Sequence, residues 1–298
     1  MVKVELGAAS MTAGLAPRRL AAAFAWLALA LAASGCSMFD QYNPFGGEKY
    51  KMEVTPDVPA SRTYDQGLEK LSKGAPKEAA KKFTDLGKQY PESDWARKGQ
   101  LMTVYANYEA GEFTDAAVAA EKYLKDYPNS SDAAYVAYLQ ANAYYSQIPD
   151  ISRDQDAATK AMQAFAEIVK KYPTSEYVED SKFKIQVCQD QLAGKEMSIG
   201  RFYLTRHNYT AAINRFRNVL QYYQTSRHAP EALYRLVEAY MGLGIVDEAQ
   251  TAAAVLGHNF PDSQWYKDAY AVLQSHGLSP AEHSESWISK IYHVVVPS

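Results

Sequence analysis

Few residues in this chain have the types and spacing that catalysis or metal binding requires. The two cysteines, Cys36 and Cys188, lie far apart, and no histidines have the spacing of metal ligands. The segment Gly242–Gly244 does not match a phosphate-binding loop and is typical of a helix end. The six histidines are His207, His228, His258, His276, His283 and His293. We therefore expect no catalytic residue, no metal and no cofactor, and the sequence does not favour an enzyme.

The cysteine with a chemical context is Cys36. Arg18 and Arg19 precede an uninterrupted apolar run, Leu20–Ala33, and two small residues separate that run from the thiol. A basic region, an apolar core too short to span a bilayer and a small-residue cleavage site are typical of a secretory signal. Residues 1–35 are therefore predicted to be a signal peptide.

Cys36 at this cleavage site resembles the bacterial lipoprotein signal, in which the cysteine is lipidated and becomes the mature N-terminus. Ser37 follows the cysteine, and in that class a residue other than Asp at this place goes with delivery to the outer membrane. The resemblance implies a lipid anchor at Cys36 and a linker over residues 36–58. An ordinary signal peptide with a coincidental cysteine is the alternative.

The chain is mildly acidic, with 31 basic and 34 acidic side chains in 298 residues. Residues 1–35 hold three of the basic and one of the acidic residues, which leaves 28 and 33 in the remainder. A nucleic-acid partner is not favoured, because phosphate binding needs a basic face. Cys188 lies in a helical pattern and is predicted to be a small buried residue.

A short motif recurs along the chain at intervals of tens of residues. The copies read QYPES (89–93), DYPNS (126–130), KYPTS (171–175) and NFPDS (259–263), with YYQTS (222–226) as a fifth that lacks the proline. An alanine stands 12 residues before every proline position, and Phe or Ala follows it four residues later. The alanines are Ala79, Ala116, Ala161, Ala212 and Ala249. Repeats of this length are the mark of a helical solenoid.

Each recurring residue has a physical reason. Gly74, Gly111 and Gly244 stand 17 residues before a proline, where positive φ would let a first helix end. The small alanine lets the two helices of a repeat cross closely, and the proline ends the second helix. This combination resembles the tetratricopeptide repeat, in which stacked helix pairs bury a continuous core.

The resemblance implies an all-α fold, a right-handed superhelix of about five helix pairs over residues 59–275. A closing helix should follow the last repeat, and residues 276–298 are expected to form a C-terminal tail. The repeats are predicted at about 59–93, 94–130, 131–175, 176–226 and 227–263.

Two of the intervals between motifs are long. The first excess falls at Ser146–Met162 and predicts an insertion between the helices of the third repeat. The second falls at Glu179–Arg206, where apolar residues continue at helical spacing past Gly194. We expect one unusually long helix there, and Gly194 leaves open whether it is continuous or kinked.

The lipoprotein signal, the five repeats and the insertion together resemble the BamD family of outer-membrane lipoproteins, whose relatives are also labelled competence lipoproteins. The likeness extends over residues 36–275 and is most specific in MSIGRFYLTRHNYTAAINRFRNVLQYYQTSRHAPEALYRLVEAYMGLG, residues 197–244. It implies a non-enzymatic scaffold, lipid-anchored on the periplasmic side of the outer membrane. The implied partners are the POTRA domains of BamA, the other BAM lipoproteins and unfolded outer-membrane β-barrel proteins.

Only a few residue roles carry over from the family. Asn214 and Arg215 stand where the family has an Asn-Arg pair, and the resemblance implies a BamA-binding site there in which the arginine makes the contact. Arg217 lies on another side of the same helix and serves as the contrast. Trp95 and the pair Tyr105 and Tyr108 are candidates for a groove that binds unfolded segments. Solvation for the arginine and core packing for the aromatic residues are the alternatives.

A different periplasmic adaptor lipoprotein with tetratricopeptide repeats, serving cell division or the Tol system, is the alternative at the level of function. Such relatives carry a coiled-coil segment and fewer repeats, whereas this sequence shows no sustained heptad pattern.

Overall fold

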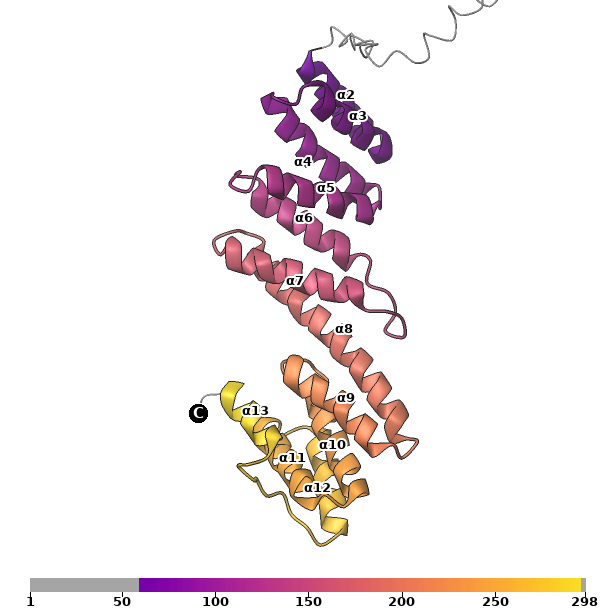
Figure 1. Ribbon diagram of the computed structural model, residues 1–298, viewed down its shortest axis with the longest axis vertical. Helices are drawn as coiled ribbons and strands as arrows, with labels where there is room; N and C mark the ends of the chain where they lie inside the picture. The colour runs from indigo at the N-terminus through magenta and orange to yellow at the C-terminus, as the bar shows by residue number, and fades with distance from the viewer. Residues whose placement is uncertain (1–58, 296–298) are drawn as a thin grey trace, which may run out of the picture. The chain divides into compact units, whose positions relative to one another are not determined.

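The computed structural model describes residues 59–295, and within that range the chain folds into twelve α-helices and no strands (Figure 1). Cys36, the predicted signal peptide and the predicted linker lie outside the described residues. The helices are α2 (Ala60–Ser72), α3 (Pro76–Gln89), α4 (Asp94–Glu109), α5 (Phe113–Asp126), α6 (Ala133–Tyr145), α7 (Asp156–Lys171), α8 (Val178–Leu204), α9 (Tyr209–Tyr222), α10 (Ala229–Leu243), α11 (Val246–Asn259), α12 (Gln264–Ser275) and α13 (Trp287–Val295).

The helices from α2 to α11 form five consecutive pairs, which we number repeats one to five. Each helix packs against the next along the chain, so the pairs stack in sequence order (Figure 1). First helices of neighbouring repeats also contact one another, as α4 does with α2 and with α6. The first helices therefore share one continuous face, which we call the helix-A face. The second helices form the helix-B face.

The alanines predicted at the helix crossings are fully buried. Ala79, Ala116, Ala161, Ala212 and Ala249 all have no exposed surface. The residues four positions later, Phe83, Ala120, Phe165, Phe216 and Ala253, are equally buried. The repeat register read from the sequence is thus confirmed, because both positions face the interior in every pair.

The core also shows a size complementarity between the two helices of a repeat. A Cβ atom added to Gly67 would lie 2.4 Å from the Phe83 ring, so the glycine makes room for the phenylalanine. Gly200 stands in the same relation to Phe216, also at 2.4 Å.

Where the second helix instead carries the small residue, the first helix carries valine. Buried Val104 shares a core cluster with Ala120, and buried Val237 shares another with Ala253. The larger residue therefore lies on the second helix in some repeats and on the first helix in others, and in each case a small residue faces it, which permits dense packing.

The first helices of three repeats end at glycines with positive φ, as predicted. Gly74, Gly111 and Gly244 adopt φ values of 70°, 74° and 73°, which favour glycine. His207 occupies the corresponding place in the fourth repeat with φ of 58°. A histidine there accepts some backbone strain, because an L residue rarely adopts this conformation.

The long helix of the fourth repeat is continuous. α8 runs through Gly194 without interruption, and its glycine has a packing role in place of a kink. A Cβ atom on Gly194 would lie 2.5 Å from Ile151 in the insertion. The insertion loop is fixed to α8 by Lys195, whose Nζ donates to the Ser152 carbonyl at 2.8 Å.

The segment expected to be a tail contains a further helix. α13 packs against α11, and its Ile288 and Ser289 are fully buried. The indole Nε1 of Trp287 donates to the Tyr240 hydroxyl at 2.8 Å. Much of the predicted tail is thus part of the folded core.

Candidate functional site

The predicted groove residues all lie on α4, on the helix-A face, but they do not form one cluster. Tyr105 and Tyr108 are half-buried and pack against the core cluster between α4, α5 and α6. Tyr108 also meets Phe113 edge-on, with ring centroids 5.6 Å apart. Burial, and then the neighbouring Tyr105, raise the pKa of Tyr135 on α6. These tyrosines therefore combine packing with a partly exposed surface.

Trp95 lies apart from these tyrosines, at the start of α4. Its ring meets Tyr64 of α2 at 5.2 Å between centroids, with a 52° angle between the planes. Lys98, one turn later on the same helix, holds its ammonium 4.8 Å from the Trp95 ring centroid. The site offers an apolar ring system with one exposed cation above it.

A related arrangement, with stacked rings and the cation over the tyrosine of the preceding first helix, occurs between repeats three and four. Tyr177 precedes α8 and stacks on Tyr138 of α6, with centroids 4.6 Å apart and a 20° angle. Lys184 lies 5.0 Å from the Tyr138 ring centroid. A third copy follows repeat five, where Trp265 stacks on Tyr234 at 5.4 Å and Arg235 lies 5.0 Å from the Tyr234 ring.

The contacts of Trp95 with Tyr64 and Lys98 were not predicted, although the sequence contains a recurring aromatic position. An aromatic residue stands four positions after the motif proline in three copies, as Trp95, Tyr177 and Trp265. Each of the three meets a tyrosine of the preceding first helix, with stacked rings at Tyr177 and Trp265 and tilted rings at Trp95. We call the three sites the aromatic–cation stacks.

The three stacks differ in how far their cation reaches solvent. The Lys184 side chain is only 18% exposed and makes an ion pair with Asp180 at 2.9 Å. Burial alone would lower the pKa of Lys184, but its bonds to Asp180 and Tyr138 outweigh burial and raise it. Lys98, by contrast, is exposed. The stack at Trp95 is therefore the one whose charge is most available to a ligand.

The predicted partner-binding pair lies on α9, in the helix-B half of the fourth repeat. Asn214 is exposed. The Nη1 atom of Arg215 donates to the Glu196 carboxylate on α8, at 3.3 and 3.4 Å to the two oxygens. The Arg215 side chain remains 39% exposed, so part of its guanidinium can still meet another acid.

Asn218 completes this contact between α8 and α9. Its Nδ2 donates to Oε2 of Glu196 at 2.8 Å, which leaves the acid a second partner if the arginine is removed. Arg217 points to a different side of α9, as expected, but it is not free. Its guanidinium lies 4.4 Å from the Trp287 ring centroid, and its Nε is buried without a hydrogen-bond partner.

A second ion-pair network joins α8 to α10 in the same half. Glu231 has 10% of its side chain exposed and accepts from the guanidinium groups of Arg201 and Arg235. Burial alone would raise the pKa of Glu231, but the two arginines outweigh burial and lower it below the usual range. This network fixes the relative position of the helices around the Arg215 surface.

The described residues provide no reactive thiol, no metal-binding group and no membrane-spanning helix. Cys188 is fully buried, and burial raises the pKa of its thiol to about 11. No group of acidic, histidine and cysteine side chains within residues 59–295 could hold a metal ion. In the same range no helix combines the length and apolar character needed to cross a bilayer.

The stacked helix pairs define the class of protein as a helical-repeat protein. The chain belongs to the YfiO family, described as outer membrane lipoprotein, whose model matches residues 56–256.

Named relatives cover most of this chain. It is 41% identical over 263 residues to the "outer membrane protein assembly factor BamD" of Caulobacter vibrioides, which covers 88% of this chain and 84% of the relative. The protein of the same name from Rickettsia prowazekii is 40% identical over 232 residues, 78% of this chain and 92% of the relative.

The matching solved structures are more distant in sequence. The TPR2AB domain of yeast Sti1 matches 73% of this chain and 85% of its own at 11% identity, with a TM-score of 0.36. PilW, a type IV pilus biogenesis factor, matches 70% of this chain and 96% of its own at 15% identity, with a TM-score of 0.31.

Proposed function

We propose that this protein is a non-enzymatic scaffold of the outer-membrane β-barrel assembly machinery. The observation that carries the proposal is its 41% identity, over 88% of the chain, to a protein named as an outer membrane protein assembly factor. A chain that displays stacked helix pairs and exposed aromatic side chains suits a binding role. In this proposal lipid on Cys36 attaches the scaffold to the periplasmic side of the outer membrane.

The proposed docking site for the POTRA domains of BamA is the surface of Asn214 and Arg215. A guanidinium that is 39% exposed and bonded to Glu196 through one nitrogen has further N–H donors for a partner carboxylate. The internal pair with Glu196 also restrains the side chain, which lowers the entropy lost on binding.

The proposed client site is the helix-A face around Trp95, Tyr105 and Tyr108. Strands of outer-membrane barrels alternate apolar and polar side chains, so an extended client has an apolar edge that can lie on aromatic rings. The exposed cation of Lys98 above Trp95 could pair with a client carboxylate.

A charge test separates the docking site from general surface effects. Arg215→Glu would place a second acid beside Glu196 and disturb the helix pair, so Arg215→Ala is the cleaner variant. Asn218 continues to bond Glu196 in that variant. We expect Arg215→Ala to weaken binding of soluble POTRA domains by roughly 2 kcal/mol or more, about 30-fold, if the new ion pair is buried.

The matched control is Arg227→Ala, because Arg227 is 76% exposed and lies near Asp190 at the edge of the same half. Its POTRA affinity should change little. Equal affinity for wild type and Arg215→Ala would move the docking site elsewhere. Purification of the tagged full-length protein from solubilised envelopes without any β-barrel assembly component would refute the function itself.

A further inference from the structure

The first two repeats and the last two repeats match one another residue by residue. Gly67 and Gly200 stand 133 positions apart, and the same separation joins Phe83 to Phe216. Further pairs at this separation are Ala79 and Ala212, Val104 and Val237, Gly111 and Gly244, Ala116 and Ala249, and Pro128 and Pro261. The helices α3, α4 and α5 are therefore the counterparts of α9, α10 and α11.

In the last two repeats the helix-B surface is covered by α13. Trp287 lies against Arg217 of α9 and donates to Tyr240 of α10. Just before the helix, the Ser286 hydroxyl donates to Glu248 of α11 at 2.6 Å. A short amphipathic helix thus occupies the surface formed by these three helices.

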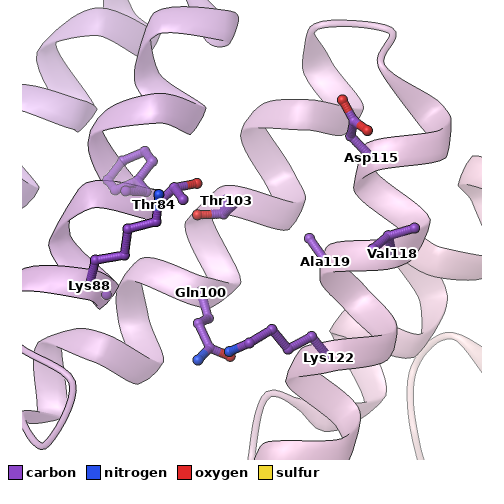
Figure 2. A pocket seen from close by; sticks show the side chains of 10 residues that line it. Thr84, Lys88, Gln100, Thr103, Asp115, Val118, Ala119 and Lys122 are labelled. Atoms are coloured by element: carbon purple, nitrogen blue, oxygen red, sulfur yellow. The ribbon is translucent and has the colours of Figure 1, made fainter. Parts of the chain in front are cut away.

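In the first two repeats the corresponding surface is an open groove. A cavity of about 350 Å³ lies between α3 and α5, with α4 as its floor (Figure 2). Its lining includes Thr84 and Asp115, the counterparts of Arg217 and Glu248. Val118 also lines it and is 62% exposed, an unusual exposure for a valine.

The groove is hollow because it has small side chains where its counterpart has large ones. Gly87 and Thr103 line it, where the other half has the buried leucines Leu220 and Leu236. The floor also contains an unsatisfied acceptor, since Oε1 of Gln100 is buried without a hydrogen-bond partner. The surface therefore combines room for a large side chain with an acceptor for one hydrogen bond.

The charges of the groove differ from those of its counterpart. Lys88 and Lys122 line it, where the other half has Gln221 and Val255. Both lysines are exposed, and Figure 2 shows them on opposite walls, Lys88 directed toward Thr84 and Lys122 toward Gln100. Lys122 also pairs with Asp126 of the same helix at 2.9 Å, an exposed pair that a ligand carboxylate can share. A ligand with acidic side chains facing the two lysines and an apolar face toward Val118 fits this pattern.

We propose that the groove between α3 and α5 binds an amphipathic α-helix of a partner protein, with an aromatic side chain in the cavity and acidic residues toward Lys88 and Lys122. The α13 surface shows that a helix of nine residues fits this kind of site. α13 from a second copy is a poor fit, because it carries Lys290 and no acidic residue. The proposal concerns the helix-B face and is independent of the client site on the helix-A face.

Site-specific crosslinking tests the proposal in the full-length, envelope-bound protein. A photoreactive p-benzoylphenylalanine replaces Val118 in one variant and the exposed Tyr270 of α12 in the control. We expect an adduct from position 118 alone, mapped by mass spectrometry to an acidic amphipathic helix of another protein. Lys88→Glu with Lys122→Glu should reduce the adduct at least tenfold, and lysines in place of the partner's acids should restore it.

Three outcomes would overturn the proposal. These are an adduct to an extended client strand, an adduct to a second copy of this chain, and no adduct at position 118 in a variant that melts at the wild-type temperature. Insensitivity of the adduct to the charge reversal would contradict it as well. None of these outcomes depends on Arg215 or on the Trp95 stack, so the proposed function is tested separately.

Discussion

The contact in which the small Gly200 makes room for the large Phe216 ring gives a direct test of how the repeats are packed. A Cβ atom on Gly200 would lie 2.4 Å from the Phe216 ring, a distance that real Cβ atoms do not adopt. Gly200→Val should therefore destabilise the protein by roughly 1–3 kcal/mol through overpacking. Phe216→Ala should cost about 3–5 kcal/mol, because it leaves a cavity in a fully buried site.

The double variant reproduces the arrangement of Val104 with Ala120, in which the valine is on the first helix. The added valine fills part of the cavity that the lost ring leaves, and the lost ring removes the clash. We expect the double variant to lose far less than the two single losses together, with a coupling of about 2–3 kcal/mol.

Urea unfolding followed by circular dichroism measures the three variants and the wild type. The matched control is Gly87→Ala, a helical glycine whose added Cβ would meet nothing within 4 Å. That change should stabilise by about 0.5–1 kcal/mol through the backbone entropy of glycine. Additive losses in the double variant, or a Gly200→Val protein as stable as wild type, would refute the complementarity.

Three further predictions concern stability. Burial, and then the charge of Arg227, lower the pKa of His228, so the native state resists protonation of this residue. The stability that His228 contributes is therefore present above pH ~6.5 and is lost as the pH falls through its folded pKa. His228→Gln should flatten the dependence of melting temperature on pH between about 7.5 and 5.5, and an unchanged slope would contradict the assignment. Glu231→Gln leaves two arginines facing a neutral amide, and we expect roughly 1–3 kcal/mol of lost stability at neutral pH by urea titration. Because the pKa of Glu231 is lowered in the folded state, this difference should shrink as the pH falls below about 4.5 and through the folded pKa. Trp287→Ala should release α13, measured as faster hydrogen exchange in Ile288–Tyr292, while exchange in α4 stays as in wild type.

The periodic features of the fold could be predicted from the sequence because each repeat imposes the same local requirement. The alanine at every crossing and the glycine at three helix ends are such cases. The length of α8 followed from apolar spacing alone. The packing role of Gly194 could not be predicted, since it depends on contact with Ile151 across a loop.

The site was harder to predict than the fold. The acid that pairs with Arg215 lies 19 positions away on another helix, and no local pattern marks it. α13 was missed although Trp287, Ile288 and Ile291 have helical spacing, because the segment is short and follows a polar stretch. The contact of Arg217 with Trp287 could not be predicted for the same reason.

We propose that one scaffold carries two separate binding surfaces, a client site on the helix-A face and a docking site at Arg215. The most direct measurement is the affinity of each variant for two ligands, a C-terminal β-strand peptide of an outer-membrane protein and a soluble POTRA fragment. Trp95→Leu with Tyr105→Leu keeps an apolar side chain at both positions while removing the aromatic rings, and it should weaken binding of the peptide at least tenfold while the POTRA affinity stays unchanged. Arg215→Ala should do the reverse. The result would contradict two separate surfaces if both variants lost affinity for both ligands, or if neither variant lost affinity for either ligand.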